Sequence, residues 1–233
     1  AQAHGATYDG QPVGSFGDAA AFSFCQDKII STCGEGGILV TNDSSMWEAA
    51  WAYKDHGKSY EAVYQRQHPV GFRWVHESIG TNWRVTEPQA AVGRIQLKKL
   101  DSWVEKRRHA AMRLTECFSK LPGLRVTRPP DHVGHSYYKY YAFVRPDALC
   151  AGWTRDRIMS AIGAEGIPCH AGSCPEIYRE RAFHGIAEPA ERLPVARVLG
   201  ETSLMFEVHP TLTDGDLSDV CCAVEKVMAA AAV

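Results

Sequence analysis

The sequence predicts an α/β fold, in which short strands alternate with helices. Apolar segments of strand length and of helix length follow one another along the chain without an internal repeat. Of the 233 residues, 45% are hydrophobic and 22% are charged, as in an average globular domain. A chain of this length can bury a substantial core in one or two domains. The composition excludes a disordered chain, a collagen-like repeat and a small disulfide-stapled peptide.

Two strands are predicted in the first forty residues. Residues 19–24 form a short strand in which Ser23 alternates with two Phe residues and therefore faces away from them. Residues 28–37 form a polar turn that ends in Gly-Glu-Gly-Gly. Residues 38–40, Ile-Leu-Val, are predicted to form a second strand that is buried.

A helix and a long loop are predicted next. Residues 42–45 offer N-caps for a helix that carries Trp47, Ala50 and Trp51 on one face. Residues 56–85 have no sustained periodicity. A loop of this length is unusual unless it is functional or packs against a partner.

The strongest helix signal begins at Thr86, which forms a capping box with Gln89, and Pro88 falls in the first turn. Apolar residues then recur at helical spacing as far as Leu121, where Pro122-Gly123 ends the pattern. At 1.5 Å per residue this helix would be on the order of 50 Å long. Such a helix usually spans more than one domain or layer, and it divides the chain into two parts.

The second half of the chain again alternates strands and helices. The predicted elements are a strand over 137–144, a helix capped by Thr154 and stopped by Gly166, an extended piece at 167–170, a short helix over 175–183, a strand over 203–208 and a final helix capped by Thr213.

Charge and hydropathy exclude further classes. The formal net charge is −2, so the chain lacks the broad basic field of a dedicated nucleic-acid or membrane-surface binder. Basic and aromatic residues do interleave between Lys58 and Arg84, but they suit a phosphate-bearing cofactor and a nucleotide sugar equally well. No apolar run approaches the ~18–20 residues of a membrane span, and no signal sequence opens the chain. We therefore expect a cytoplasmic protein.

Eight Cys and ten His residues raise the question of a metal, and none is predicted. The sequence contains no C-x-x-C pair, and the cluster of Cys169, His170 and Cys174 reads as a loop. Cys221 and Cys222 are adjacent within a predicted helix and so point in different directions. The scattered cysteines are interpreted as small buried hydrophobic residues in a reducing compartment.

Lys28 taken alone is an ordinary turn lysine, and the P-loop spacing is not met. Its surroundings are more specific. The sequence contains, in this order, Ala-Gln-Ala-His-Gly-Ala at 1–6, Gly-Ser-Phe-Gly-Asp at 14–18, Phe-Ser-Phe at 22–24 followed by Lys28, Gly-Glu-Gly-Gly at 34–37, Val-Thr-Asn-Asp at 40–43, Gly-Thr-Asn-Trp-Arg at 80–84, Gln-Ala-Ala at 89–91 with Gln96-Leu97, Ser203-Leu204 and His209-Pro210. Together these motifs resemble the DegT-type sugar aminotransferases, which have the large pyridoxal-phosphate fold of aspartate aminotransferase. The resemblance covers essentially all 233 residues, in the family's order.

The resemblance implies a domain division. Residues 1–86 would be the remainder of the large cofactor-binding domain, residues 87–121 the long connecting helix, and residues 122–233 a smaller α+β domain. In the family a carboxylate that pairs with the pyridinium nitrogen stands just upstream of the segment that begins here at Ala1. The sequence is therefore expected to be N-terminally truncated.

The resemblance also assigns the cofactor-binding residues. Lys28 would bond covalently to pyridoxal 5'-phosphate and would then move a proton between the substrate and the cofactor. Ser23 would contact the cofactor phosphate, and Gln2 would lie near the phenolic oxygen. Asn82 would reach the phosphate from the neighbouring subunit of a homodimer.

Two residues are assigned to the substrate. Arg84 would supply positive charge at the mouth of the active site. His170 lies in a stretch that often lines the sugar-nucleotide pocket, although Pro168-Cys169-His170-Ala171 departs from the family's aromatic-proline pattern.

The function implied by the resemblance is transfer of an amino group from an amino acid, glutamate, to a keto-sugar nucleotide. Polysaccharide or glycosylated natural-product synthesis is the process that the family suggests. The alternative is a catalytically inactive fragment of such an enzyme, which folds and dimerises but does not turn over.

Overall fold

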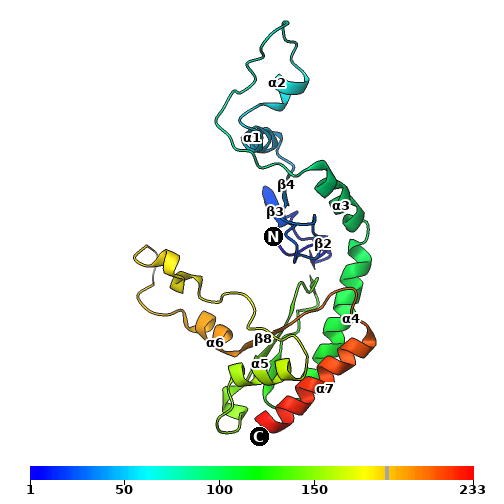
Figure 1. Ribbon diagram of the computed structural model, residues 1–233, viewed down its shortest axis with the longest axis vertical. Coiled ribbons are helices and arrows are strands. Elements are labelled where there is room, and N and C mark those ends of the chain that lie inside the picture. Colours follow the sequence, from blue (N-terminus) through cyan, green and yellow to red (C-terminus); the bar gives the residue numbers. More distant parts are fainter. Residues whose placement is uncertain (187–188) are drawn as a thin grey trace. The chain divides into compact units, whose positions relative to one another are not determined.

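The computed structural model describes residues 1–186 and 189–233, and the chain divides into two compact units (Figure 1). Unit 1 comprises Ala1–Ser102 and Asp131–His135, and unit 2 comprises Trp103–Pro130 and Ser136–Val233. Each unit mixes strands with helices, which confirms the predicted α/β class.

Unit 1 is built around small antiparallel sheets. In one, β1 lies between β2 and β6; in the other, β3 pairs with β4, and Ser23 faces Gly37 in the register. The elements are β1 (Thr7–Tyr8), β2 (Gln11–Pro12), β3 (Ala19–Ser23), β4 (Gly37–Thr41), α1 (Ser44–Lys54), α2 (Tyr60–Tyr64), α3 (Glu87–Leu97) and β6 (Val133–Gly134).

The predicted strand at 38–40 exists as part of β4, but the prediction that it is buried is wrong. Ile38, Leu39 and Val40 are 47%, 48% and 36% exposed. An apolar run is buried on both faces only where a layer covers each face. β3 and β4 form a two-stranded sheet, and the described part of unit 1 leaves these side chains partly uncovered.

The helix predicted after residue 45 is α1, and Asp43 is its N-cap, accepting a hydrogen bond from the amide of Met46 at 2.9 Å. The stretch 56–85 is mostly irregular, as predicted, but it contains α2, which the sequence reading missed. Ser59 caps α2 by accepting a bond from the amide of Ala62 at 3.1 Å. A helix of five residues is too short to show a hydrophobic period.

The single long helix predicted from residue 86 to residue 121 is also a wrong prediction. The Thr86–Gln89 capping box is present, but α3 ends at Leu97 and α4 (Leu100–Phe118) begins after a short turn. Ile95 and Leu100 are five residues apart, so the apolar pattern does not continue on one helical face across the break. None of the α3 residues is buried, and Ile95 is 57% exposed.

Unit 2 has an antiparallel sheet of order β5-β7-β8, in which Tyr140 faces Phe206. Helices α4, α5 and α7 contribute Phe118, Ile158 and Val224 to its core, each fully buried. Besides most of α4, the elements are β5 (Leu124–Val126), β7 (Tyr140–Val144), α5 (Arg155–Ala164), α6 (Pro194–Thr202), β8 (Ser203–Phe206), α7 (Asp214–Ala231) and the 3-10 turns η1 (Pro146–Ala148), η2 (Ile177–Arg179) and η3 (Arg181–Phe183).

The predicted caps in unit 2 are confirmed, since Thr154 caps α5 and Thr213 caps α7 with a capping box. The short helix predicted at 175–183 is instead the two 3-10 turns η2 and η3. The sequence reading missed α6, although Pro194 occupies its first turn, a position that favours helix starts.

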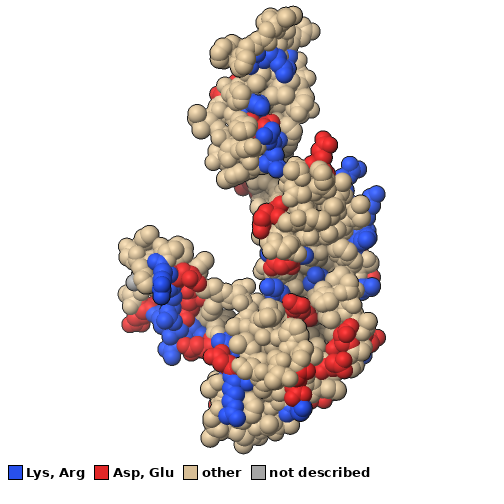
Figure 2. Space-filling view, viewed as in Figure 1, with Lys and Arg blue, Asp and Glu red and all other residues tan. Residues whose placement is uncertain are grey.

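Positive and negative side chains are interspersed on the face of the protein drawn in Figure 2. None of the described helices is long and apolar enough to cross a bilayer.

The prediction that the cysteines are buried is wrong for three of them, because Cys117 is buried whereas Cys33, Cys174 and Cys222 are exposed. The described residues contain no group of three or more His, Cys, Asp or Glu side chains arranged to hold a metal.

Candidate functional site

Lys28 projects from a tight turn after β3. The amide of Lys28 donates to the carbonyl of Cys25 at 3.0 Å, and the next residues, Ile29 and Ile30, are each 2% exposed. Lys28 is the last residue of this turn, directly before these buried residues, and its side chain is 16% exposed. Its Nζ atom lies 2.8 Å from a carboxylate oxygen of Asp27. The sequence reading did not assign a role to Asp27.

The predicted phosphate ligand, Ser23, stands at the end of β3, five residues before Lys28. Its hydroxyl accepts a hydrogen bond from the amide of Cys25 at 3.3 Å, and its own amide donates to the carbonyl of Ala1 at 2.9 Å. This last bond brings the exposed Gln2 into the neighbourhood of Ser23. The backbone therefore places Gln2, Ser23 and Lys28 near one end of β3, and their roles toward the cofactor remain predictions.

Two glycines allow close approach in the chain after Lys28, Gly36 to Thr32 and Gly37 to β3. A Cβ atom on Gly36 would lie 2.5 Å from the hydroxyl of Thr32, and one on Gly37 would lie 2.9 Å from the carbonyl of Phe22. Both separations are below van der Waals contact, so side chains are excluded at these positions. The amide of Phe24 donates to the carbonyl of Gly36 at 2.7 Å, which joins the glycine turn to the end of β3.

Helix α3 supports this turn with two glutamine side chains. Gln96 accepts a hydrogen bond from the amide of Ser31 at 2.9 Å, and Gln89 donates to the carbonyl of Glu35 at 3.0 Å. Between them Gly93 allows close approach, since a Cβ there would lie 3.0 Å from a methyl group of Thr32. The sequence reading missed this support. Its signal was the spacing of seven residues between the glutamines, which places both on one helix face.

Asn82 and Arg84 form a second cluster in unit 1, at the end of α1. Arg84 donates to the amide oxygen of Asn82 at 2.6 Å and pairs with Asp55 at 3.0 Å. Asn82 and Asp55 also form an isolated antiparallel bridge. The contacts made by these two predicted site residues are thus with each other and with Asp55. Their predicted roles toward phosphate and substrate remain predictions.

His170 belongs to unit 2 and is exposed. Its backbone amide donates to the carbonyl of Met205 at 3.0 Å, and the amide of Met205 donates back at 2.7 Å. These two bonds fix the extended piece at 167–170 beside β8, and the imidazole stays at the surface. Its predicted part in a sugar-nucleotide pocket remains a prediction.

The groups around β3 fit pyridoxal phosphate by their chemistry. An amine bonds to an aldehyde, and a hydroxyl donates to a phosphate oxygen. Lys28 supplies the amine and Ser23 the hydroxyl, from the same β3 end. Because Gly36 and Gly37 carry no side chains, the backbone beside these two groups is left uncovered. The donor set therefore agrees with the cofactor that the sequence predicts.

Comparison with known proteins identifies the family. The DegT/DnrJ/EryC1/StrS aminotransferase family matches residues 1–225. The chain is 34% identical over 215 residues to dTDP-3-amino-3,4,6-trideoxy-alpha-D-glucose transaminase of Streptomyces venezuelae, covering 91% of this chain and 51% of that enzyme. It is 32% identical over 232 residues to GDP-perosamine synthase of Caulobacter vibrioides, covering 98% of this chain and 57% of that enzyme. The chain thus spans a little over half the length of these relatives.

Solved structures give the same result. The fold superposes on an aminotransferase of Psychrobacter cryohalolentis with a TM-score of 0.93 and 50% identity, over 97% of this chain and 60% of that one. It superposes on DesV of S. venezuelae with a TM-score of 0.83 and 30% identity, over 98% of this chain and 56% of that one. The β3 end with Lys28, Ser23 and their glycine turn therefore lies in a chain that belongs to the DegT/DnrJ/EryC1/StrS aminotransferase family.

Proposed function

We propose that this protein serves in the transfer of an amino group from an amino acid, glutamate, to a keto-sugar nucleotide, with pyridoxal phosphate as cofactor. The relatives support this substrate class, because their names are those of enzymes of dTDP-, GDP- and UDP-linked sugars. The observation that carries the proposal is the Lys28 side chain, which is 16% exposed and directly precedes the buried residues Ile29 and Ile30.

Each residue at the β3 end has a part in the proposed reaction. Lys28 would hold the cofactor through Nζ, and its neutral amine would move a proton between the substrate carbon and the product. Asp27, whose carboxylate oxygen lies 2.8 Å from Nζ, positions the Lys28 side chain. Ser23 would hold the phosphate through its hydroxyl, and Gln2 is assigned to the phenolic oxygen. When bound, pyridoxal phosphate supplies an electron sink for the carbon that loses its proton.

We assign Arg84 and His170 to the substrate and Asn82 to the cofactor phosphate. Arg84 is a fixed cation, since Asn82 and Asp55 restrain its guanidinium group, and a planar guanidinium suits a nucleotide phosphate. The proposal includes a homodimer that shares its active sites, with Asn82 acting across the subunits. It also includes a cytoplasmic location, where the amino acid and the sugar nucleotide are both present.

An activity assay with matched lysine variants tests the proposal. The protein is incubated with pyridoxal phosphate, glutamate and a panel of keto-sugar nucleotides, and formation of 2-oxoglutarate and amino sugar is measured. Lys28→Arg keeps the positive charge but removes the reactive amine, and it is expected to abolish turnover. Lys98→Arg, on the exposed end of α3, should leave turnover unchanged. Equal activity of the Lys28→Arg variant and the wild type would refute the assignment.

A further inference from the structure

Two cysteines and a glutamate meet where α4 packs beside α7 in unit 2. The Cys117 thiol donates to a carboxylate oxygen of Glu225 at 3.2 Å, and it also interacts with the Cys221 thiol. Cys221 and Glu225 are four residues apart and so occupy one face of α7. Cys117 belongs to the hydrophobic core cluster of unit 2, and Cys221 packs against that cluster. Both thiols are free.

The surroundings of Cys221 favour its thiolate. The hydrogen bond with Cys117 is the largest cause that lowers the pKa of Cys221, and the positive charges of Arg113 and Lys120 lower it further. Burial and the charge of Glu225 act in the opposite direction. The same hydrogen bond, together with burial, raises the pKa of Cys117. A partly exposed cysteine in a positive environment is the usual setting of a thiol that reacts with oxidants.

We propose that Cys221 is a site of oxidation by hydrogen peroxide and that Cys117 resolves the oxidised form into a reversible disulfide between α4 and α7. The assignment goes beyond amino transfer and does not depend on it, because every group involved lies in unit 2. It gives separate roles to the attacking thiol, which is partly exposed, and the resolving thiol, which is 8% exposed.

The chemistry balances in two steps. The Cys221 sulfur attacks one peroxide oxygen, so that an S–O bond forms, the O–O bond breaks, and the departing hydroxide takes the Cys221 proton to become water. The Cys117 sulfur then attacks the Cys221 sulfur while its proton passes to Glu225. The S–S bond forms, the S–O bond breaks, and the second hydroxide takes that proton to become water. Two thiols lose two electrons and two protons, and one peroxide is reduced to two waters.

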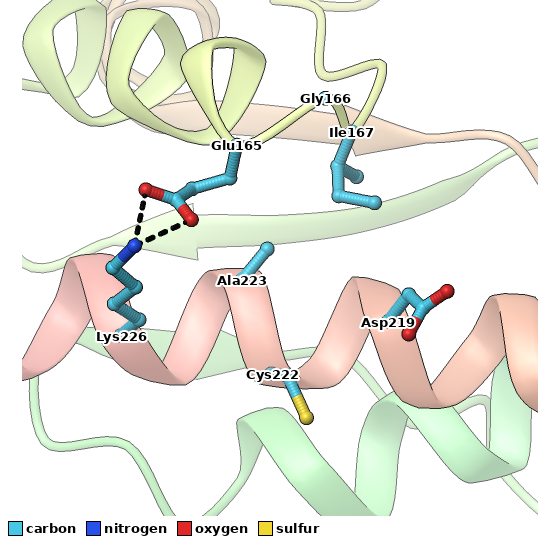
Figure 3. A pocket seen from close by; sticks show the side chains of 7 residues that line it. All are labelled: Glu165, Gly166, Ile167, Asp219, Cys222, Ala223 and Lys226. Atoms are coloured by element: carbon cyan, nitrogen blue, oxygen red, sulfur yellow. Dashed lines mark hydrogen bonds and ion pairs between the residues drawn. The ribbon is translucent and has the colours of Figure 1, made fainter.

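Cys222 provides a natural control. Successive residues of a helix point about 100° apart, and Cys222 lines a different surface, a pocket of about 390 Å³ between α5 and α7 (Figure 3). The ion pair between Lys226 and Glu165, with both N–O distances at 2.7 Å, spans this pocket. Cys222 is exposed, so an oxidant that acted by access alone would modify it before Cys221.

Peptide mapping tests the proposal on the intact protein. The protein is treated with hydrogen peroxide, its remaining thiols are alkylated, and it is digested with trypsin without reduction. Cleavage at arginine and lysine places Cys117 in the peptide 114–120, and Cys221 and Cys222 together in the peptide 198–226. We expect these two peptides to be linked, to separate after dithiothreitol treatment, and to remain linked in the Cys222→Ser variant. The exposed thiols Cys33 and Cys174 report whether the peroxide dose was sufficient.

Two variants resolve the steps. Cys117→Ser should halt the reaction at the sulfenic acid of Cys221, which dimedone traps, and Glu225→Gln should slow the linkage several-fold. If a variant folds poorly, the peptide mapping of the wild-type protein still tests whether the disulfide forms. Modification of Cys33 without any linkage of peptide 114–120 would overturn the proposal. Loss of the linkage in Cys222→Ser, with oxidation of Cys221 absent, would overturn it as well.

Discussion

Strands β4 and β8 are both short and apolar, yet β8 is buried and β4 is largely exposed. Ile38, Leu39 and Val40 of β4 are 36–48% exposed, whereas Leu204 and Phe206 of β8 are at most 1% exposed. β8 lies in a three-stranded sheet with a helix-lined core, and β4 lies in a two-stranded one. Unit 2 is therefore stabilised by packing. The Lys28 turn of unit 1 is stabilised by short-range hydrogen bonds and by close backbone approach at glycines.

Truncation in the core of unit 2 is expected to have the largest effect on stability. Phe206→Ala removes a ring that lies against Phe118 with centroids 5.1 Å apart. Loss of its burial and the resulting cavity should lower the free energy of unfolding by about 3–5 kcal/mol. Phe16→Ala, in unit 1, removes a ring that is 57% exposed and serves as the control. Denaturant titration measures the free energy of unfolding of both variants. Equal losses would contradict the view that packing stabilises unit 2 more than unit 1.

Adding a methyl group beside the Lys28 turn tests the other half of the comparison. Gly36→Ala would place a Cβ atom 2.5 Å from the Thr32 hydroxyl, so it should cost roughly 1–3 kcal/mol by overpacking. Because Thr32 is 2% exposed, it has little room to move away. The double variant with Thr32→Ala should recover part of the loss. Additive losses in a double-mutant cycle would show that this contact does not hold the turn.

Unit 2 also contains a segment held by polar contacts, at Glu176. Hydrogen bonds from Arg192, and then from Tyr178, lower the pKa of its carboxyl from 4.5 to about 2. Because the folded-state pKa is depressed, the stabilisation is complete above pH 4.5 and is lost as the pH falls toward 2. Glu176→Gln should therefore flatten the fall of the unfolding midpoint across this window. Glu180→Gln is the matched control, and an unchanged profile for Glu176→Gln would contradict the assignment.

The smallest expected effect is a gain in stability. A Cβ atom on Gly163, inside α5, would meet no atom within 4 Å. Gly163→Ala should raise the free energy of unfolding by roughly 0.5–1 kcal/mol, because alanine loses less backbone entropy on forming a helix. A loss of stability, read by the same titration, would mean that this face of α5 is more constrained than its contacts indicate.

Local signals in the sequence predicted the helix caps, whereas the helices α2 and α6 were missed. The caps Asp43, Thr154 and Thr213 are where short polar side chains precede an apolar period, and a cap depends only on its own first turn. The exposure of Ile38 was not predictable, because burial depends on layers supplied from elsewhere in the fold. The break before Leu100 was visible as a slip in phase, but several apolar residues on either side masked it.

For the candidate site, motif order supplied Lys28, Ser23 and Gln2. All three lie near the end of β3, and their roles remain predictions. The partners of these residues were not predicted, because Asp27 and the glutamines Gln89 and Gln96 act through contacts that only the folded chain reveals.

Reductive trapping tests the central assignment most directly. The protein is incubated with pyridoxal phosphate, reduced with borohydride and digested, and the modified peptide is sequenced by mass spectrometry. The expected result is a single phosphopyridoxyl group on Lys28, lost in Lys28→Arg and retained in Lys98→Arg. A protein that binds the cofactor but carries the group on another lysine would contradict the account.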